Sequence, residues 1–132
     1  VIKGQTTMQQ LVIVRGLPGT GKSTIAKELF PNHTHWEADK FFVNQFGKYC
    51  FQPRLIPYAH QWCQKGVQDA LNRGESVIVT NTFTRKHEYM VYQNMAKDMG
   101  IPCYVMIANG NYENVHGVPP ETLAKMAARW EN

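Results

Sequence analysis

Three short apolar runs, rich in β-branched residues, stand apart along the chain at 11–14, 76–80 and 103–107. Short runs without polar alternation are typical of strands buried on both faces of a sheet. A fourth and less apolar segment, 35–39, also predicts a short strand, which would end at the carboxylate of Asp39. The pattern therefore predicts four strands.

Between these runs, apolar residues recur at the three- and four-residue spacing of amphipathic helices. The predicted helices cover 23–30, 58–73, 85–99 and 121–130. Their limits carry the usual signals, namely Pro31 and Asn32 after the first, Gly74 and Gly100 after the second and third, Thr84 before the third, and Pro119 and Pro120 before the last. Strands that alternate with helices predict an α/β fold, a three-layer sandwich with a mainly parallel sheet and helices on both faces.

Ligands of parallel sheets bind at the edge where the strands end. Four segments that follow predicted strands reach this edge: 16–23, Asp39, 81–85 and 109–118. We expect these segments to line one cleft.

The segment between the first strand and the first helix is a complete Walker A loop. Its residues, all expected to bind the nucleotide, are Gly16, Leu17, Pro18, Gly19, Thr20, Gly21, Lys22 and Ser23, followed by Thr24. The glycines permit backbone conformations in which successive N–H groups point at phosphate oxygens, and the helix adds the positive end of its dipole. We expect Lys22 to reach the β- and γ-phosphates of ATP and Ser23 to coordinate Mg²⁺. The alternative is a glycine-rich turn before an ordinary helix.

Asp39 is the candidate general base, because phosphoryl transfer to an alcohol needs an acceptor for the hydroxyl proton. A helix cap, or a magnesium ligand that acts through water, is the alternative. The third strand ends in Thr80, Asn81 and Thr82, at the place where many nucleotide hydrolases have a Walker B aspartate. These side chains can still bind a magnesium-bound water or the attacking group, but the missing carboxylate disfavours a fast, self-contained ATPase.

Arg85 and Lys86 open the third predicted helix, where they either neutralise charge on the γ-phosphate or form a solvated helix start. The loop 109–118 has the position of a kinase lid but contains no arginine or lysine, and its ionisable residues are Tyr112, Glu113 and His116. A transition-state arginine therefore has to come from elsewhere, with Arg54, Arg85 and Arg129 as the options. We assign Arg85 to catalysis and Arg129 to nucleotide binding.

Aromatic residues are frequent just after the second predicted strand. They are Trp36, Phe41, Phe42, Phe46, Tyr49 and Phe51. Such side chains either pack the core or stack on a base of a nucleotide or nucleic acid.

Length and charge set further limits. The 132 residues predict a single domain over 8–132, with 1–7 as a cloning remnant or a disordered start. A formal net charge of +4 and an isoelectric point of about 9.0 fit an anionic ligand without choosing between nucleotide and nucleic acid. The sequence has no membrane-length apolar stretch, no signal peptide and three unpaired-looking cysteines, which predicts a cytoplasmic protein, or one of the host cytoplasm if viral.

The segments 16–26 and 77–82, together with Asp39, resemble the P-loop NTPase fold of the phage polynucleotide kinases. The likeness extends further to an allied group of small AAA-type ATP-binding proteins, in which 38–42, 59–62, 81–82 and 116–119 look like recurring signatures. This resemblance implies a phosphotransferase that uses ATP and Mg²⁺, with Lys22 and Ser23 on phosphate and metal and Asp39 as general base toward a hydroxyl.

The leading hypothesis is a kinase that transfers the γ-phosphate of ATP to a hydroxyl of a nucleic acid or nucleotide. The acceptor implied by the resemblance is the 5′-hydroxyl of a strand, and a hydroxymethyl-pyrimidine in DNA is a variant of the same chemistry. Phe42 lies near the position where polynucleotide kinases have an arginine, so the nucleotide half of the resemblance is the firmer half. An ATP-binding regulatory module without transfer and a small-molecule kinase are the alternatives, and the sequence leaves the oligomeric state unknown.

Overall fold

A computed structural model describes residues 8–110 and 117–132. In this part of the chain, four strands form one parallel sheet in the order β2-β3-β1-β4. The strands are β1 (Leu11–Arg15), β2 (Thr34–Trp36), β3 (Val77–Asn81) and β4 (Cys103–Ile107). The helices are α1 (Lys22–Leu29), α2 (Ile56–Asn72), α3 (Lys86–Met99) and α4 (Pro120–Ala128), with short 3₁₀ helices at η1 (Ala38–Phe42) and η2 (Pro53–Leu55).

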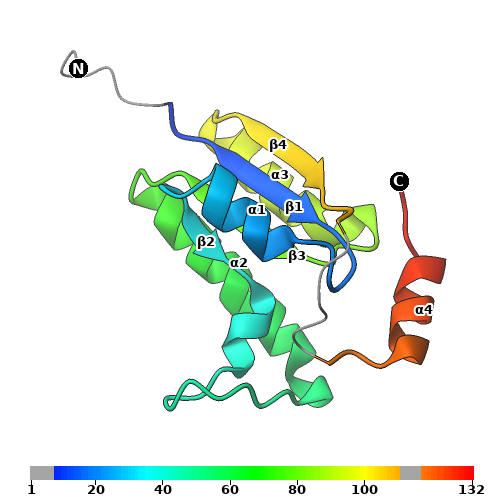
Figure 1. Ribbon diagram of the computed structural model, residues 1–132. Helices are drawn as coiled ribbons and strands as arrows, with labels where there is room; N and C mark the ends of the chain where they lie inside the picture. Colours follow the sequence, from blue (N-terminus) through cyan, green and yellow to red (C-terminus); the bar gives the residue numbers. More distant parts are fainter. Residues whose placement is uncertain (1–7, 111–116) are drawn as a thin grey trace.

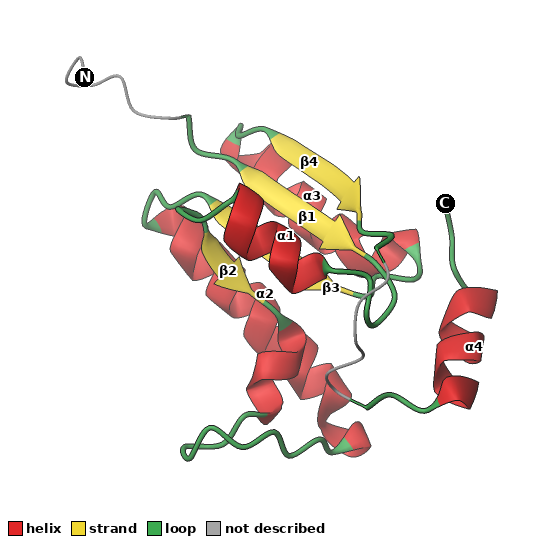
Figure 2. Ribbon diagram, in the orientation of Figure 1, coloured by secondary structure: helices red, strands yellow, loops and turns green. Residues whose placement is uncertain are grey.

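The two central strands, β1 and β3, are buried on both faces by helices, as their apolar runs predict, whereas the edge strands β2 and β4 are partly exposed. Leu11 and Ile13 of β1 belong to the core beneath α2 and α3, whereas Val12 and Val14 belong to the smaller core beneath α1. Helix α1 therefore lies on one side of the sheet, and α2 and α3 lie on the other (Figure 1, Figure 2). The predicted α/β fold, with a parallel sheet between layers of helices, is confirmed.

Backbone hydrogen bonds hold the segments after β1, β3 and β4 together at the carboxyl edge. Gly16 N donates to Thr82 O at 3.2 Å, and Ala108 N donates to Arg15 O at 2.8 Å. Gly110 N donates to the carbonyl of Thr20 in the Walker loop at 2.9 Å. The Walker loop is thus tied to both neighbouring loops.

The second strand differs most from its prediction. It ends at Trp36, and the chain then turns into η1, so that Asp39 lies on a 3₁₀ helix rather than at a strand end. The reason is a long-range contact: the side-chain Oδ1 of Asn81 accepts a hydrogen bond from Ala38 N at 2.9 Å. Because the N–H of Ala38 donates to this side chain, it cannot donate to a neighbouring strand.

The C-terminal segment is attached at its end rather than along its helix. Helix α4 has no buried residue and stands away from the sheet in Figure 1. After it, Glu131 N donates to Thr84 O at 2.6 Å, and Glu131 O accepts from the guanidinium of Arg15. In the described residues, no helix is both long and apolar enough to cross a bilayer.

Candidate nucleotide-binding site

The Walker loop adopts a conformation that requires its glycines for two different reasons. Gly19 and Gly21 have φ angles of 82° and 93°, in the left-handed region. Gly16 instead has no room for a side chain, because a Cβ there would lie 2.8 Å from Ala108 O. The hydroxyl of Thr20 donates to Leu17 O at 2.7 Å and stiffens the loop. Pro18 lies within it, and Thr24 follows in the first turn of α1.

Lys22 folds back over the loop that precedes it. Its ammonium donates to Gly16 O at 2.9 Å and to Leu17 O at 3.1 Å. Burial lowers the pKa of Lys22, and the negative charges of Glu37 and Asp39 counteract this shift. Both carboxylates therefore act on the ammonium that is expected to bind phosphate, and both stabilise its charged form.

Glu37 is a buried carboxylate that sequence reasoning overlooked. Its Oε2 accepts hydrogen bonds from Ser23 Oγ at 3.3 Å and from Thr80 Oγ1 at 3.2 Å. It is only 9 % exposed, although it immediately follows the half-buried edge strand β2. The carboxylate missing from the end of β3 is thus supplied from the end of β2.

A chain of hydrogen bonds orients this carboxylate. Lysine has only donors, so Lys40 Nζ donates to His35 Nδ1 at 3.5 Å, which leaves Nε2 of the neutral ring to donate to Thr80 Oγ1 at 2.6 Å. Burial, together with the charge of Lys40, lowers the pKa of His35 to about 4, so the imidazole is neutral at pH 7 and forms no ion pair with Glu37 at 3.7 Å. The hydroxyl hydrogen of Thr80 then points at Glu37.

Asp39 is half-buried on η1, close enough to the loop for its charge to act on Lys22. Burial, followed by the charges of Asp39 and Glu37, raises the pKa of Tyr49 to about 12. Asn81 positions this helix through its bond to Ala38 N. Thr80 therefore orients Glu37, and Asn81 orients the helix that carries Asp39. The carbonyl of Thr82 accepts the hydrogen bond from Gly16 in the Walker loop.

Two of the three candidate arginines lie at the loop that follows β3. Arg85 is exposed at the start of α3, and Arg129 Nε donates to Thr84 Oγ1 at 3.1 Å, so both lie at the loop that follows β3. Arg54 is on η2, with its guanidinium on Gln52 Oε1 at 3.1 Å, and does not join them. The lid positions Tyr112, Glu113 and His116 lie outside the described residues.

The oxygen donors around Ser23 suit a magnesium ion. Mg²⁺ in nucleotide sites takes one or two carboxylate or hydroxyl oxygens and otherwise binds phosphates and water. Ser23 and Glu37 supply this set at hydrogen-bond distance from each other. Within the described ranges there is no cluster of three or more His, Cys, Asp or Glu that would hold a metal by itself. The residues present therefore fit Mg²⁺ bound together with a nucleotide.

The aromatic residues divide between core and surface. Phe42 is buried, with Tyr49 and Phe51 packed edge-on against it at ring distances of 6.3 and 5.0 Å. Phe46 is 84 % exposed. Trp36 and Phe41 line a surface groove beside α2.

Comparison with known proteins adds a family to this geometry. A family model described as an AAA domain matches residues 11–111. The chain is 26 % identical over 146 residues to human NEDD4-binding protein 2, covering 92 % of this chain and 8 % of that protein. It is 25 % identical over 126 residues to a putative bifunctional polynucleotide phosphatase/kinase of Acanthamoeba polyphaga mimivirus, covering 94 % and 24 %. The chain thus spans less than a quarter of either relative.

Among solved structures, the fold is similar to a chain of the Pnkp1/Rnl/Hen1 complex. The TM-score is 0.59 with 23 % sequence identity, covering 92 % of this chain and 40 % of that chain. The likeness extends to the fold alone.

Proposed function

The chain belongs to the AAA domain family, and from this premise we propose that it is an ATP-dependent phosphotransferase whose acceptor is a hydroxyl of a nucleic acid or nucleotide. The observation that carries the proposal is the meeting of three groups at one edge of the sheet: the Walker lysine Lys22, the buried Glu37 bonded to Ser23, and Asp39 on η1. One group to hold phosphate, one to hold a metal and one to accept a proton are what phosphoryl transfer needs.

In this proposal, Lys22 exchanges its bonds to loop carbonyls for bonds to the β- and γ-phosphates of ATP. Ser23 and Glu37 would hold Mg²⁺, which when bound neutralises phosphate charge. Asp39 accepts the proton of the attacking hydroxyl. The acceptor oxygen then bonds to the γ-phosphorus, the bond from that phosphorus to the bridging oxygen breaks, and ADP leaves. Arg85 and Arg129 are the candidates for stabilising the charge that develops during transfer.

The nature of the acceptor is the finer part of the proposal. It is supported by the similarity to the mimivirus relative, a putative bifunctional polynucleotide phosphatase/kinase, and by the excess of basic residues in the chain. The 5′-hydroxyl of a strand is the acceptor we expect. A hydroxymethyl group on a pyrimidine of DNA would use the same residues, so only substrates can separate the two.

The experiment is transfer of labelled γ-phosphate from ATP with Mg²⁺ to 5′-hydroxyl DNA, 5′-hydroxyl RNA, hydroxymethyl-pyrimidine DNA and nucleosides. We expect label on one nucleic-acid class, its loss in Lys22→Ala, and its loss in Asp39→Asn with ATP still bound. Transfer that survives in Asp39→Asn would remove the base from the mechanism. ATP binding without transfer to any acceptor would favour a regulatory module, and transfer to a sugar or other metabolite alone would favour a small-molecule kinase.

A further inference from the structure

An open groove of about 960 Å³ runs along α2, and none of the Walker-loop residues lines it. We call it the α2 groove. Its aromatic lining consists of Trp36, Phe41, Tyr58 and Trp62, and its charged lining of Arg54, Lys65 and Asp69. Tyr58 is 58 % exposed and Trp62 is 38 % exposed, so these rings offer large apolar faces to the solvent. None of these residues takes part in the proposed phosphate chemistry. Arg54 was a candidate for it in the sequence, but it lies apart from Arg85 and Arg129.

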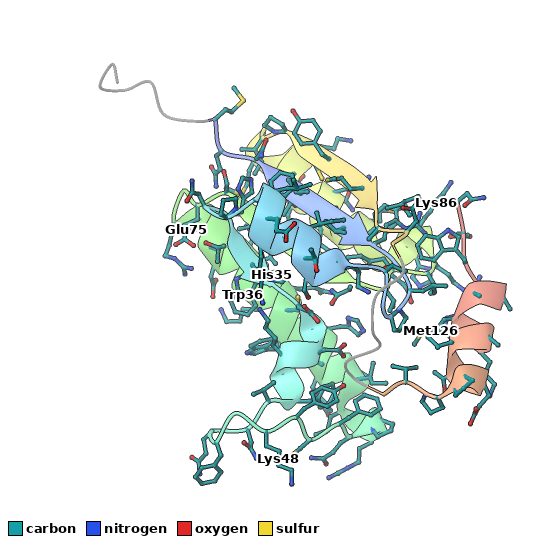
Figure 3. All side chains as sticks on the ribbon, in the orientation of Figure 1. His35, Trp36, Lys48, Glu75, Lys86 and Met126 are labelled. Carbon is teal, nitrogen blue, oxygen red and sulfur yellow. The ribbon has the colours of Figure 1, made fainter. Side chains whose placement is uncertain are left out.

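The floor of the groove is built by a close fit between β2 and α2. The indole of Trp36 lies directly over Gly66, where even a Cβ would collide with the ring. Trp62 packs edge-on against Trp36 at a ring distance of 4.9 Å and against Phe41 at 5.9 Å. In Figure 3 the side chain of Trp36 lies on the α2 side of its strand. These contacts fix the rings in place, so that a ligand would meet a preformed aromatic surface.

The segment 40–68, which supplies most of the groove lining but not Trp36 or Asp69, has an excess of positive charge. Residues 40–68 contain four of the fourteen Lys and Arg and none of the ten Asp and Glu, so the remainder has ten of each sign. The four are Lys40, Lys48, Arg54 and Lys65. The nearest acidic residues, Asp39 and Asp69, flank the segment, and Asp69 lies 3.2 Å from Lys65 in an exposed ion pair. Such a pair is worth little and is readily exchanged for a phosphate.

Positive charge interleaved with exposed aromatic faces matches single-stranded nucleic acid, whose bases stack on the rings and whose phosphates pair with the cations. The groove also lies beside the element that carries the proposed base, because its lining residue Phe41 and Asp39 are on the same 3₁₀ helix. A strand with its 5′-hydroxyl at Asp39 would therefore meet the groove with its next nucleotides.

From these observations we propose that the α2 groove binds a single-stranded segment of the acceptor polynucleotide, downstream of the hydroxyl that receives the phosphate. The inference rests on the proposed function for the direction of the strand, but the binding itself needs neither ATP nor transfer. It makes the acceptor a polynucleotide rather than a free nucleotide.

The test is equilibrium binding of fluorescein-labelled decathymidylate, followed by fluorescence anisotropy without ATP. Trp62→Ala is expected to weaken binding about 5- to 100-fold, as expected for the loss of one stacked base. Arg54→Ala is expected to lower the slope of log affinity against log salt by about 0.7, the effect of one phosphate contact on a single strand. Asp69→Asn, which frees Lys65, is expected to tighten binding instead.

Matched controls lie on the opposite edge of the sheet and on another helix. Tyr104→Ala removes an aromatic side chain of β4 that is 51 % exposed, and Lys97→Ala removes an exposed cation of α3; both should leave the affinity unchanged. Retention of stabilisation by ATP in Trp62→Ala and Arg54→Ala would show that these variants are folded.

Unchanged binding in both groove variants, or equal weakening in Tyr104→Ala, would overturn the proposal and leave the groove to another occupant such as a protein segment. Weaker binding of duplex than of single strand supports it, and the reverse order contradicts it.

If transfer to every acceptor fails while the groove variants still weaken decathymidylate binding, the proposed function fails and the groove stands. If transfer succeeds but is indifferent to the groove variants, the groove fails and the function stands.

Discussion

The carboxylate of Glu37 is buried, and its orientation is fixed by hydrogen bonds. Two hydroxyl donors, Ser23 and Thr80, converge on one oxygen, and Thr80 is itself oriented by the neutral ring of His35. Groups that orient a metal ligand typically change metal affinity by 10- to 100-fold when they are removed. The arrangement thus presents a fixed negative oxygen next to the Walker serine.

Replacement of this charge tests the role directly. Glu37→Gln keeps the size of the side chain and loses the negative charge beside Ser23. We expect the Mg²⁺ concentration for half-maximal transfer to rise by about 10- to 100-fold. The measurement is a magnesium titration of labelled phosphate transfer, with Glu75→Gln, a half-exposed carboxylate bonded to Arg73 and Thr34, as the control. An unchanged titration in Glu37→Gln would exclude Glu37 from metal binding.

Asn81 makes a second prediction at this scale. Asn81→Leu removes the acceptor of Ala38 N and leaves a buried backbone donor unpaired, at a cost of about 1–3 kcal/mol. Because that donor begins η1, the helix of Asp39, transfer should fall further than ATP binding. Asn81→Asp keeps the acceptor oxygen and should retain the position of η1. Urea unfolding measures the loss of stability, and transfer kinetics and ATP binding measure the effect on η1. Equal losses of transfer in Asn81→Leu and Asn81→Asp would contradict a positioning role.

Sequence reasoning reached the Walker residues but not Glu37, and the reason is one of distance along the chain. The loop 16–23 is contiguous, so its chemistry is visible in the order of its residues. The role of Glu37 depends on partners 14 and 43 residues away, and in sequence it is one acidic residue beside a more prominent aspartate. Only the register of β2 on β3, which pairs Trp36 with Val79, brings Glu37 next to Thr80.

At the scale of elements, one buried arginine connects the first strand to the last segment. The guanidinium of Arg15 donates to Phe83 O at 2.9 and 3.1 Å and to Glu131 O, between the rings of Tyr89 and Trp130 at 4.9 and 4.2 Å. Phe83, with a φ of 46°, occupies a backbone conformation that is uncommon outside glycine. Arg15 thus adds a buried cation to the bonds that Glu131 N and Arg129 already make to Thr84 in the loop after β3.

Removal of this cation should weaken the attachment of the C-terminal segment, which would keep its bonds to Thr84. We expect Arg15→Met to cost about 2–4 kcal/mol of unfolding free energy, from hydrogen bonds to a charged donor and two cation–π contacts. Helix α4, which buries no residue, should then be cleaved faster in limited proteolysis. Arg73→Met removes an exposed arginine and should change stability by less than about 0.5 kcal/mol. Similar costs in the two variants would contradict the anchoring role.

The elements themselves were predictable where local pattern decides them. The apolar strands β1, β3 and β4 and the helices between them follow from runs and periodicity. The second strand was predicted to reach Asp39 and instead ends at Trp36, because its continuation is set by Asn81, 43 residues from Ala38. Arg15 was likewise invisible as an anchor, because its acceptors at Phe83 and Glu131 are distant in the chain.

For the molecule as a whole, charge and topology separate two surfaces. The loops after β1, β3 and β4 meet at one edge, where the Walker loop is hydrogen bonded to both of its neighbours. The basic excess lies in 40–68, which begins on η1 and includes most of α2. The acidic residues Glu37 and Asp39 follow β2 directly, Glu37 just before η1 and Asp39 within it, and therefore lie between the Walker edge and the basic segment along the chain. A nucleotide at one surface and a polyanionic acceptor at the other would therefore meet at these carboxylates.

Because the Walker loop is bonded to the loops after β3 and β4, a nucleotide that binds it should stabilise the whole sheet rather than the loop alone. A ligand at about 100 times its dissociation constant adds about 2.7 kcal/mol, which for a chain of this size raises Tm on the order of 10 °C. Lys22→Ala should abolish the shift produced by ATP with Mg²⁺, whereas Lys27→Ala, on the exposed side of the same helix, should retain it. Thermal unfolding at several ATP concentrations measures both. A shift that survives in Lys22→Ala, or that is lost equally in Lys27→Ala, would mean that ATP binds outside the Walker loop and would remove the premise of phosphate transfer at this edge.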